Sequence, residues 1–64
     1  MDKVIYRVVD KTSGYDEYDF VSIRGAAKWI EELLETFECR RKDVAAYVIQ
    51  YTKHGDFKSQ VRFF

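Results

Sequence analysis

One stretch of helical periodicity, from about Ser22 to Glu38, constrains the fold of this chain more than any other feature. Apolar residues recur there at the i, i+3, i+4, i+7 spacing, which gathers them on one side of an α-helix. Ser22 suits the N-cap position, because its hydroxyl can accept a hydrogen bond from a free amide of the first turn. The stretch predicts an amphipathic helix whose buried face comprises Ile23, Ala26, Ala27, Ile30, Leu33, Leu34 and Phe37.

Two short stretches before this helix predict a β-hairpin. The stretch from Val4 to Val9 is rich in β-branched residues, and the stretch from Glu17 to Val21 alternates acidic with aromatic side chains. Between them lies turn chemistry in which Gly14 can adopt a positive φ. The side of the first strand expected to face the core is wholly apolar and comprises Val4, Tyr6 and Val8.

A second hairpin is predicted after the helix, with strands from Asp43 to Tyr51 and from Phe57 to Phe64 and a turn at residues 53–56. The orientation of the third strand is ambiguous, because both of its faces are apolar. Its helix-facing side is either the set Tyr47, Ile49 and Tyr51 or the set Ala46, Val48 and Gln50. The first set is favoured because its bulkier side chains fill a small core better.

The fold class that follows is α+β, a four-stranded antiparallel sheet in the order ββαββ with one amphipathic helix packed on one face. Residues 1–64 are expected to form a single domain, and no proline interrupts any strand. One helix covers only one face of such a sheet. The uncovered face is expected to carry Ile5, Arg7, Val9, Glu17, Asp19, Lys58, Gln60, Arg62 and Phe64.

Composition limits what can stabilise so small a domain. With 64 residues, folding buries only roughly 60% of the surface of the unfolded chain. Cys39 is the only cysteine, so no internal disulfide forms, and with His54 it supplies too few ligands for a structural zinc. The lone thiol and the lack of a secretory signal favour a cytoplasmic location. No apolar run approaches the roughly 18 residues that span a bilayer.

The sequence offers little for catalysis or cofactor binding. His54 is the only histidine and falls in a predicted turn, and no motif surrounds Cys39. The acidic residues Asp16, Glu17 and Asp19 are expected to diverge along a strand, whereas a hard cation needs converging oxygens. The chain is therefore predicted to have no enzymatic activity, no metal, no cofactor and no small-molecule substrate.

Binding of single-stranded nucleic acid through the uncovered face is the alternative hypothesis. Open sheets that bind single strands use aromatic side chains for stacking and Arg or Lys for phosphates. Tyr47 and Tyr51 would supply such stacking only if the third strand turned them outward. A net charge of zero and the carboxylates of Glu17 and Asp19 count against this function.

The favoured hypothesis is a non-catalytic module that binds another protein or a second copy of itself. Apolar side chains amid Arg and Gln on an uncovered sheet face are typical of a protein interface. Such a chain would act as a regulator, inhibitor or accessory subunit, and the order ββαββ is common in small proteins of phages and mobile elements. The predicted contact residues are Arg7, Trp29, Lys58, Arg62 and Phe64.

Overall fold

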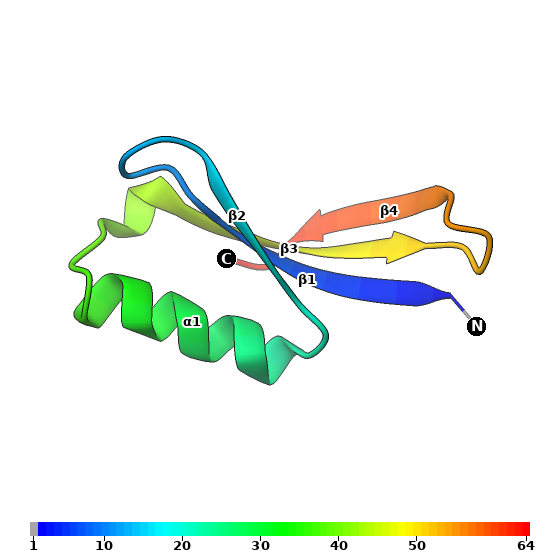
Figure 1. The fold of residues 1–64 in the computed structure, drawn as a ribbon, viewed down its shortest axis with the longest axis horizontal. Helices are drawn as coiled ribbons and strands as arrows, with labels where there is room; N and C mark the ends of the chain where they lie inside the picture. Colours follow the sequence, from blue (N-terminus) through cyan, green and yellow to red (C-terminus); the bar gives the residue numbers. More distant parts are fainter. Residues whose placement is uncertain (1) are drawn as a thin grey trace.

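A computed structural model describes residues 2–64 of the chain and contains one four-stranded sheet with one helix on it (Figure 1). The helix lies between two β-hairpins in sequence, and a short 3-10 turn joins it to the second hairpin. The elements are β1 (Lys3–Asp10), β2 (Asp16–Phe20), α1 (Ile23–Glu35), η1 (Arg41–Asp43), β3 (Val44–Tyr51) and β4 (Phe57–Arg62).

The sheet is antiparallel throughout, with the strand order β2-β1-β3-β4. The first strand of each hairpin lies in the centre, so β1 pairs with β3 and the strands β2 and β4 form the two edges. In the register between the central strands, Val8 is opposite Ala46 and Arg7 is opposite Tyr47. The predicted α+β fold class and its ββαββ order are confirmed.

Helix α1 begins where the sequence predicts and ends earlier. The Ser22 hydroxyl accepts a hydrogen bond from the Gly25 amide at 3.2 Å, as expected of an N-cap. The last helical residue is Glu35 rather than Glu38. Beyond it the chain reverses through Glu38, whose φ of 54° is left-handed, and the Cys39 amide donates to the Leu33 carbonyl at 2.8 Å.

Replacing Glu38 by glycine should stabilise the protein by about 1 kcal/mol, because a side chain at a left-handed φ costs roughly that much. Urea unfolding followed by circular dichroism measures the change. The matched control is Glu31→Gly, which lies inside the helix and should lower the free energy of unfolding by about 1 kcal/mol. A similar loss of unfolding free energy in both variants would contradict the left-handed conformation of Glu38.

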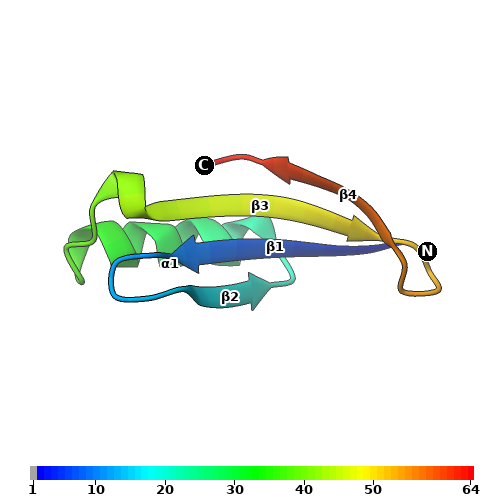
Figure 2. The same ribbon diagram turned by 90° about the horizontal axis from the view of Figure 1, so that it is seen from above.

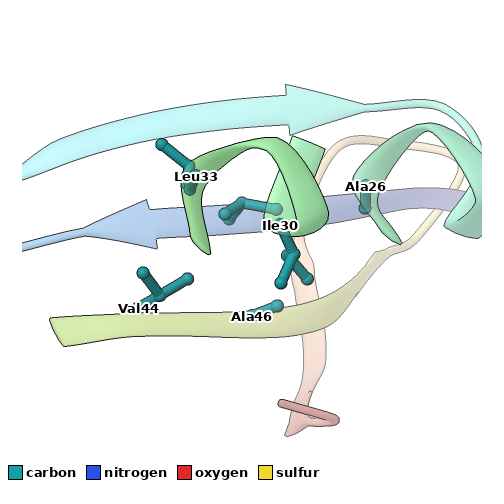
Figure 3. Packing of buried hydrophobic residues seen from close by; sticks show 6 residues of the cluster. Ala26, Ile30, Leu33, Val44 and Ala46 are labelled. Atoms are coloured by element: carbon teal, nitrogen blue, oxygen red, sulfur yellow. The ribbon is translucent and has the colours of Figure 1, made fainter. Parts of the chain in front are cut away.

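The core lies between α1 and the ends of the central strands (Figure 3). Ala26, Ile30 and Leu33 point from the helix toward the sheet, and Val44 and Ala46 point from β3 toward the helix. Alanine on both elements lets them approach closely. The buried stripe of the helix is shorter and narrower than predicted. Ile23 and Phe37 at its two ends are more than half exposed, and Ala27 is exposed as well.

The favoured orientation of the third strand was wrong. The smaller residues of β3, including Ala46, face α1, and Tyr47, Ile49 and Tyr51 lie on the opposite face. The physical reason is space, because small side chains fill the layer between the helix and the sheet. Ala26 and Ala46 are both fully buried there, and a tyrosine in place of Ala46 would not fit. Close contact, and not bulk, decides which side of β3 meets the helix.

Helix α1 covers only part of the sheet (Figures 1 and 2). It contacts β1 and β2, whereas β4 and the far half of β3 extend beyond it. Thirteen residues give a helix about 20 Å long, while the molecule extends 38 Å along its longest axis. Strand β4 and the far half of β3 are consequently without a helix on either face.

Candidate functional site

The β3–β4 hairpin carries apolar side chains on the face that it shares with the helix. Val48 lies opposite Tyr6 on one side and Val61 on the other. Val61 is 58% exposed, and Phe63 meets the Tyr6 ring edge-on at a centroid distance of 6.3 Å. These residues continue the apolar surface of the core past the end of the helix.

The opposite face of the hairpin is aromatic. Tyr47 and Tyr51 are half-buried there, and the Phe57 ring lies edge-on to Tyr51 at a centroid distance of 6.4 Å. We call the apolar residues on the two faces of this hairpin the β3–β4 surface. It comprises Val48, Val61 and Phe63 on the helix side and Tyr47, Tyr51 and Phe57 on the other.

A β-bulge corrects the expected alternation of the fourth strand. Tyr51 pairs with Phe57 while Gln50 pairs with Ser59, so Lys58 is an extra residue in β4. Phe57, which simple alternation from Val61 places on the helix side, therefore lies beside Tyr51. Lys58 forms an ion pair with Asp2, with its Nζ 2.7 Å from a carboxylate oxygen.

Arg7 and Arg62 lie on the uncovered face, as predicted, in one row across the sheet. The row runs Asp19, Arg7, Tyr47, Arg62 from edge to edge. The Arg7 Nε donates to the Asp19 carboxylate at 2.8 Å, and a second guanidinium nitrogen donates to the same carboxylate at 3.1 Å. A Glu17 carboxylate oxygen lies 3.8 Å from a third guanidinium nitrogen of Arg7. Carboxylates therefore neutralise Arg7, whereas Arg62 is exposed and donates to the Phe64 carbonyl.

The bidentate hydrogen bond from Arg7 lowers the pKa of Asp19 below its ordinary value of 3.8. The ion pair therefore stabilises the fold fully above that value, and the stabilisation is lost as the pH falls through the lowered pKa. Asp19→Asn should cost about 0.5–1 kcal/mol at pH 7, because both side chains are partly exposed. Urea unfolding should show this difference shrink as the pH is lowered below 3.8. Asp56→Asn, without an ion pair among residues 2–64, should show no pH-dependent difference.

Two predicted contact residues lie elsewhere. Phe64 does not continue the alternation of the fourth strand, because β4 ends at Arg62. Its ring packs against the core cluster and lies 4.3 Å from the Arg41 guanidinium. Trp29 packs at the edge of the core between the rings of Tyr18 and Phe37.

The structure thus places Arg7 and Arg62 in one row, on either side of Tyr47, and separates them from Trp29, Lys58 and Phe64. Alternation along the fourth strand leaves Val61 and Phe63 off the predicted uncovered face, and the sequence did not show that they are exposed because the helix does not reach them. Comparing the diameter of one helix, roughly 10 Å, with the width of a four-stranded sheet, roughly 4.8 Å per strand, was the available signal. His54 and Cys39 lie at opposite ends of the sheet, in the β3–β4 turn and after α1.

Comparisons with protein-family models, curated proteins and solved structures gave no match. Within residues 2–64, no helix is long and apolar enough to cross a membrane. Function is therefore inferred from the geometry of this chain alone.

Proposed function

We propose that this chain is a small non-catalytic module that binds another protein and acts as a regulator, inhibitor or accessory subunit. The observation that carries the proposal is the β3–β4 surface, which is apolar on both faces and has no helix over either. Exposed apolar patches on small proteins commonly mark interaction sites. Aromatic residues and arginine, which are enriched in interfaces, are both present there.

The size of the chain is sufficient for this role. A standard interface buries roughly 800 Å² on each partner, about one sixth of the 4724 Å² accessible surface of this chain. The β3–β4 surface projects from the helix-covered part of the sheet, so a partner can meet its two faces and its edge together (Figure 2).

The edge strands differ in the partner that they fit. The side chains of β2 include Asp16, Glu17 and Asp19, and this acidic edge repels another acidic strand. The only charged side chains of β4 are the basic ones of Lys58 and Arg62, and its other side chains are apolar or neutral. A partner that adds a strand beside β4 is therefore expected to be apolar with acidic flanks. A second copy of this chain is one alternative occupant.

Affinity capture with the purified chain, combined with sedimentation at two concentrations, tests the proposal. The expected result is a stoichiometric complex with another protein, which persists at moderate salt because apolar burial stabilises it. Concentration-dependent dimerisation in place of capture would identify a second copy as the occupant. A monomer that captures no protein and binds oligonucleotides would contradict the proposal.

One observation favours the alternative function of binding single-stranded nucleic acid. Tyr47 and Tyr51 lie on the uncovered face, and Arg62 is the strand neighbour of Tyr47. Arg7 is already paired with Asp19, however, which leaves few free cations for phosphates on this face. If this function holds, binding of an oligonucleotide should weaken steeply with salt and fall about tenfold in Tyr47→Ala.

A further inference from the structure

A cavity lies at the opposite end of the molecule from the β3–β4 turn, between the C-terminal half of α1 and the β1–β2 hairpin. Its volume is about 340 Å³, at the lower end of the range of roughly 300–1,000 Å³ found for ligand pockets. Helix α1 supplies Trp29, the segment after it supplies Phe37, and the β1–β2 hairpin supplies Tyr18, Asp10 and Asp16. The lining therefore combines an aromatic wall, formed by Tyr18, Trp29 and Phe37, with an acidic wall, formed by Asp10 and Asp16.

The aromatic wall consists of three rings inclined to one another. The rings of Tyr18 and Trp29 have centroids 5.1 Å apart and planes at 58°, and those of Trp29 and Phe37 are 5.8 Å apart at 56°. Phe37 is more than half exposed although it is apolar. All three rings line the cavity, and aromatic faces attract alkylammonium groups by the cation–π interaction, which acts within about 6 Å of a ring centroid.

The acidic wall lacks a positive partner. Asp10 and Asp16 are directly opposite each other on β1 and β2, where two like charges destabilise a strand pair. Asp10 is only 9% exposed, and its carboxylate accepts hydrogen bonds from the Thr12 amide and the Cys39 thiol. Within residues 2–64, no lysine or arginine lines the cavity or forms an ion pair with either aspartate.

We propose that this cavity binds an organic cation of the alkylammonium class, with Tyr18, Trp29 and Phe37 around the alkyl groups and Asp10 and Asp16 balancing the charge. Such a ligand satisfies both walls, since it offers apolar surface to the rings and a positive charge to the carboxylates. A metal ion does not fit, because no three His, Cys, Asp or Glu side chains of residues 2–64 converge on a metal-sized site. The cavity is remote from the β3–β4 surface, so the inference stands independently of the proposed function.

Matched probes test the site directly. Choline and its neutral isostere 3,3-dimethylbutan-1-ol differ in charge and scarcely in shape, and N-acetyl-trimethyllysine N-methylamide presents the same group as a protein side chain. Each is titrated at constant ionic strength, with the fluorescence and the indole N–H signal of Trp29, the only tryptophan, as readouts. We expect saturable binding of both cations and none of the alcohol. Tighter binding of the lysine derivative would identify a protein side chain as the source, and tighter binding of choline a free amine.

Two variants separate the cavity from general charge effects. Asp16→Asn should weaken choline binding at least about fivefold, and Phe37→Leu should weaken it by a similar factor. Glu31→Gln removes the same charge from an exposed helix position that does not line the cavity and should leave binding unchanged. Circular dichroism establishes that each variant is folded. Equal binding of the alcohol, absence of saturation with both cations, or equal effects of Asp16→Asn and Glu31→Gln would overturn the proposal.

Discussion

Replacing Ile49 by alanine should lower the free energy of unfolding by about 2–4 kcal/mol. Ile49 lies on the face without the helix and is nevertheless only 1% exposed. Tyr47 and Tyr51 flank it along β3, and Ile5 and Gln60 lie opposite it on β1 and β4. The truncated side chain would leave a void that these neighbours fill only in part, and a chain of 64 residues has roughly 6 kcal/mol of stability in total.

Urea unfolding followed by the fluorescence of Trp29 measures this loss. Ile23→Ala is the matched control, because Ile23 is 54% exposed at the start of α1 and should lose less than about 1 kcal/mol. Equal losses in the two variants would show that Ile49 is not enclosed. The sheet would then depend for its apolar burial on the helix side alone.

Replacing Val61 by aspartate should weaken binding of the protein partner at least about 30-fold. A charge in the centre of an apolar interface must be desolvated without a counter-ion, and a loss of about 2 kcal/mol is typical of an interface hot spot. Stability should change little, because Val61 is 58% exposed in the free chain. Isothermal titration calorimetry with the captured partner gives the affinity of each variant.

Val21 offers a matched control for this substitution. It is 96% exposed in the connection between β2 and α1, so Val21→Asp introduces the same charge outside the β3–β4 surface. Its affinity for the partner should equal that of the wild type. A partner that binds Val61→Asp as tightly as Val21→Asp would place the interface elsewhere on the molecule.

The sequence was sufficient for the architecture because the local pattern of residues in each element is typical of one secondary structure. The helical spacing between Ile23 and Leu33 and the strand alternation of β1 leave a single secondary structure for each. Ser22 fixes the start of the helix by a local hydrogen bond. Such features depend on neighbours in the chain, and a single sequence displays them.

The orientation of β3 was beyond the same reasoning. Both faces of the strand are apolar, so alternation does not choose between them. Tyr47 points away from the helix because its neighbour Ala46 joins the buried cluster with Ile30 of the helix, and these residues are distant in sequence. The position of α1 over the start of β3 has to be known before the helix-facing side of β3 can be chosen.

The candidate site was predicted only where strand alternation continues without interruption. Arg7 and Arg62 lie on the expected face for this reason. The bulge at Lys58 moves Phe57 to the other face, and the end of β4 releases Phe64 toward the core. Bulges and strand ends depend on the pairing of two strands, which the pattern of one strand does not encode.

Amide hydrogen exchange of the chain with and without its protein partner tests the central claim most directly. The account predicts that the partner slows exchange in β4 and in the far half of β3, and leaves the acidic edge strand β2 unchanged. Protection confined to β2 or to the outer face of α1 would contradict it. Protection of β4 by a single-stranded oligonucleotide, with none by any protein, would contradict it equally.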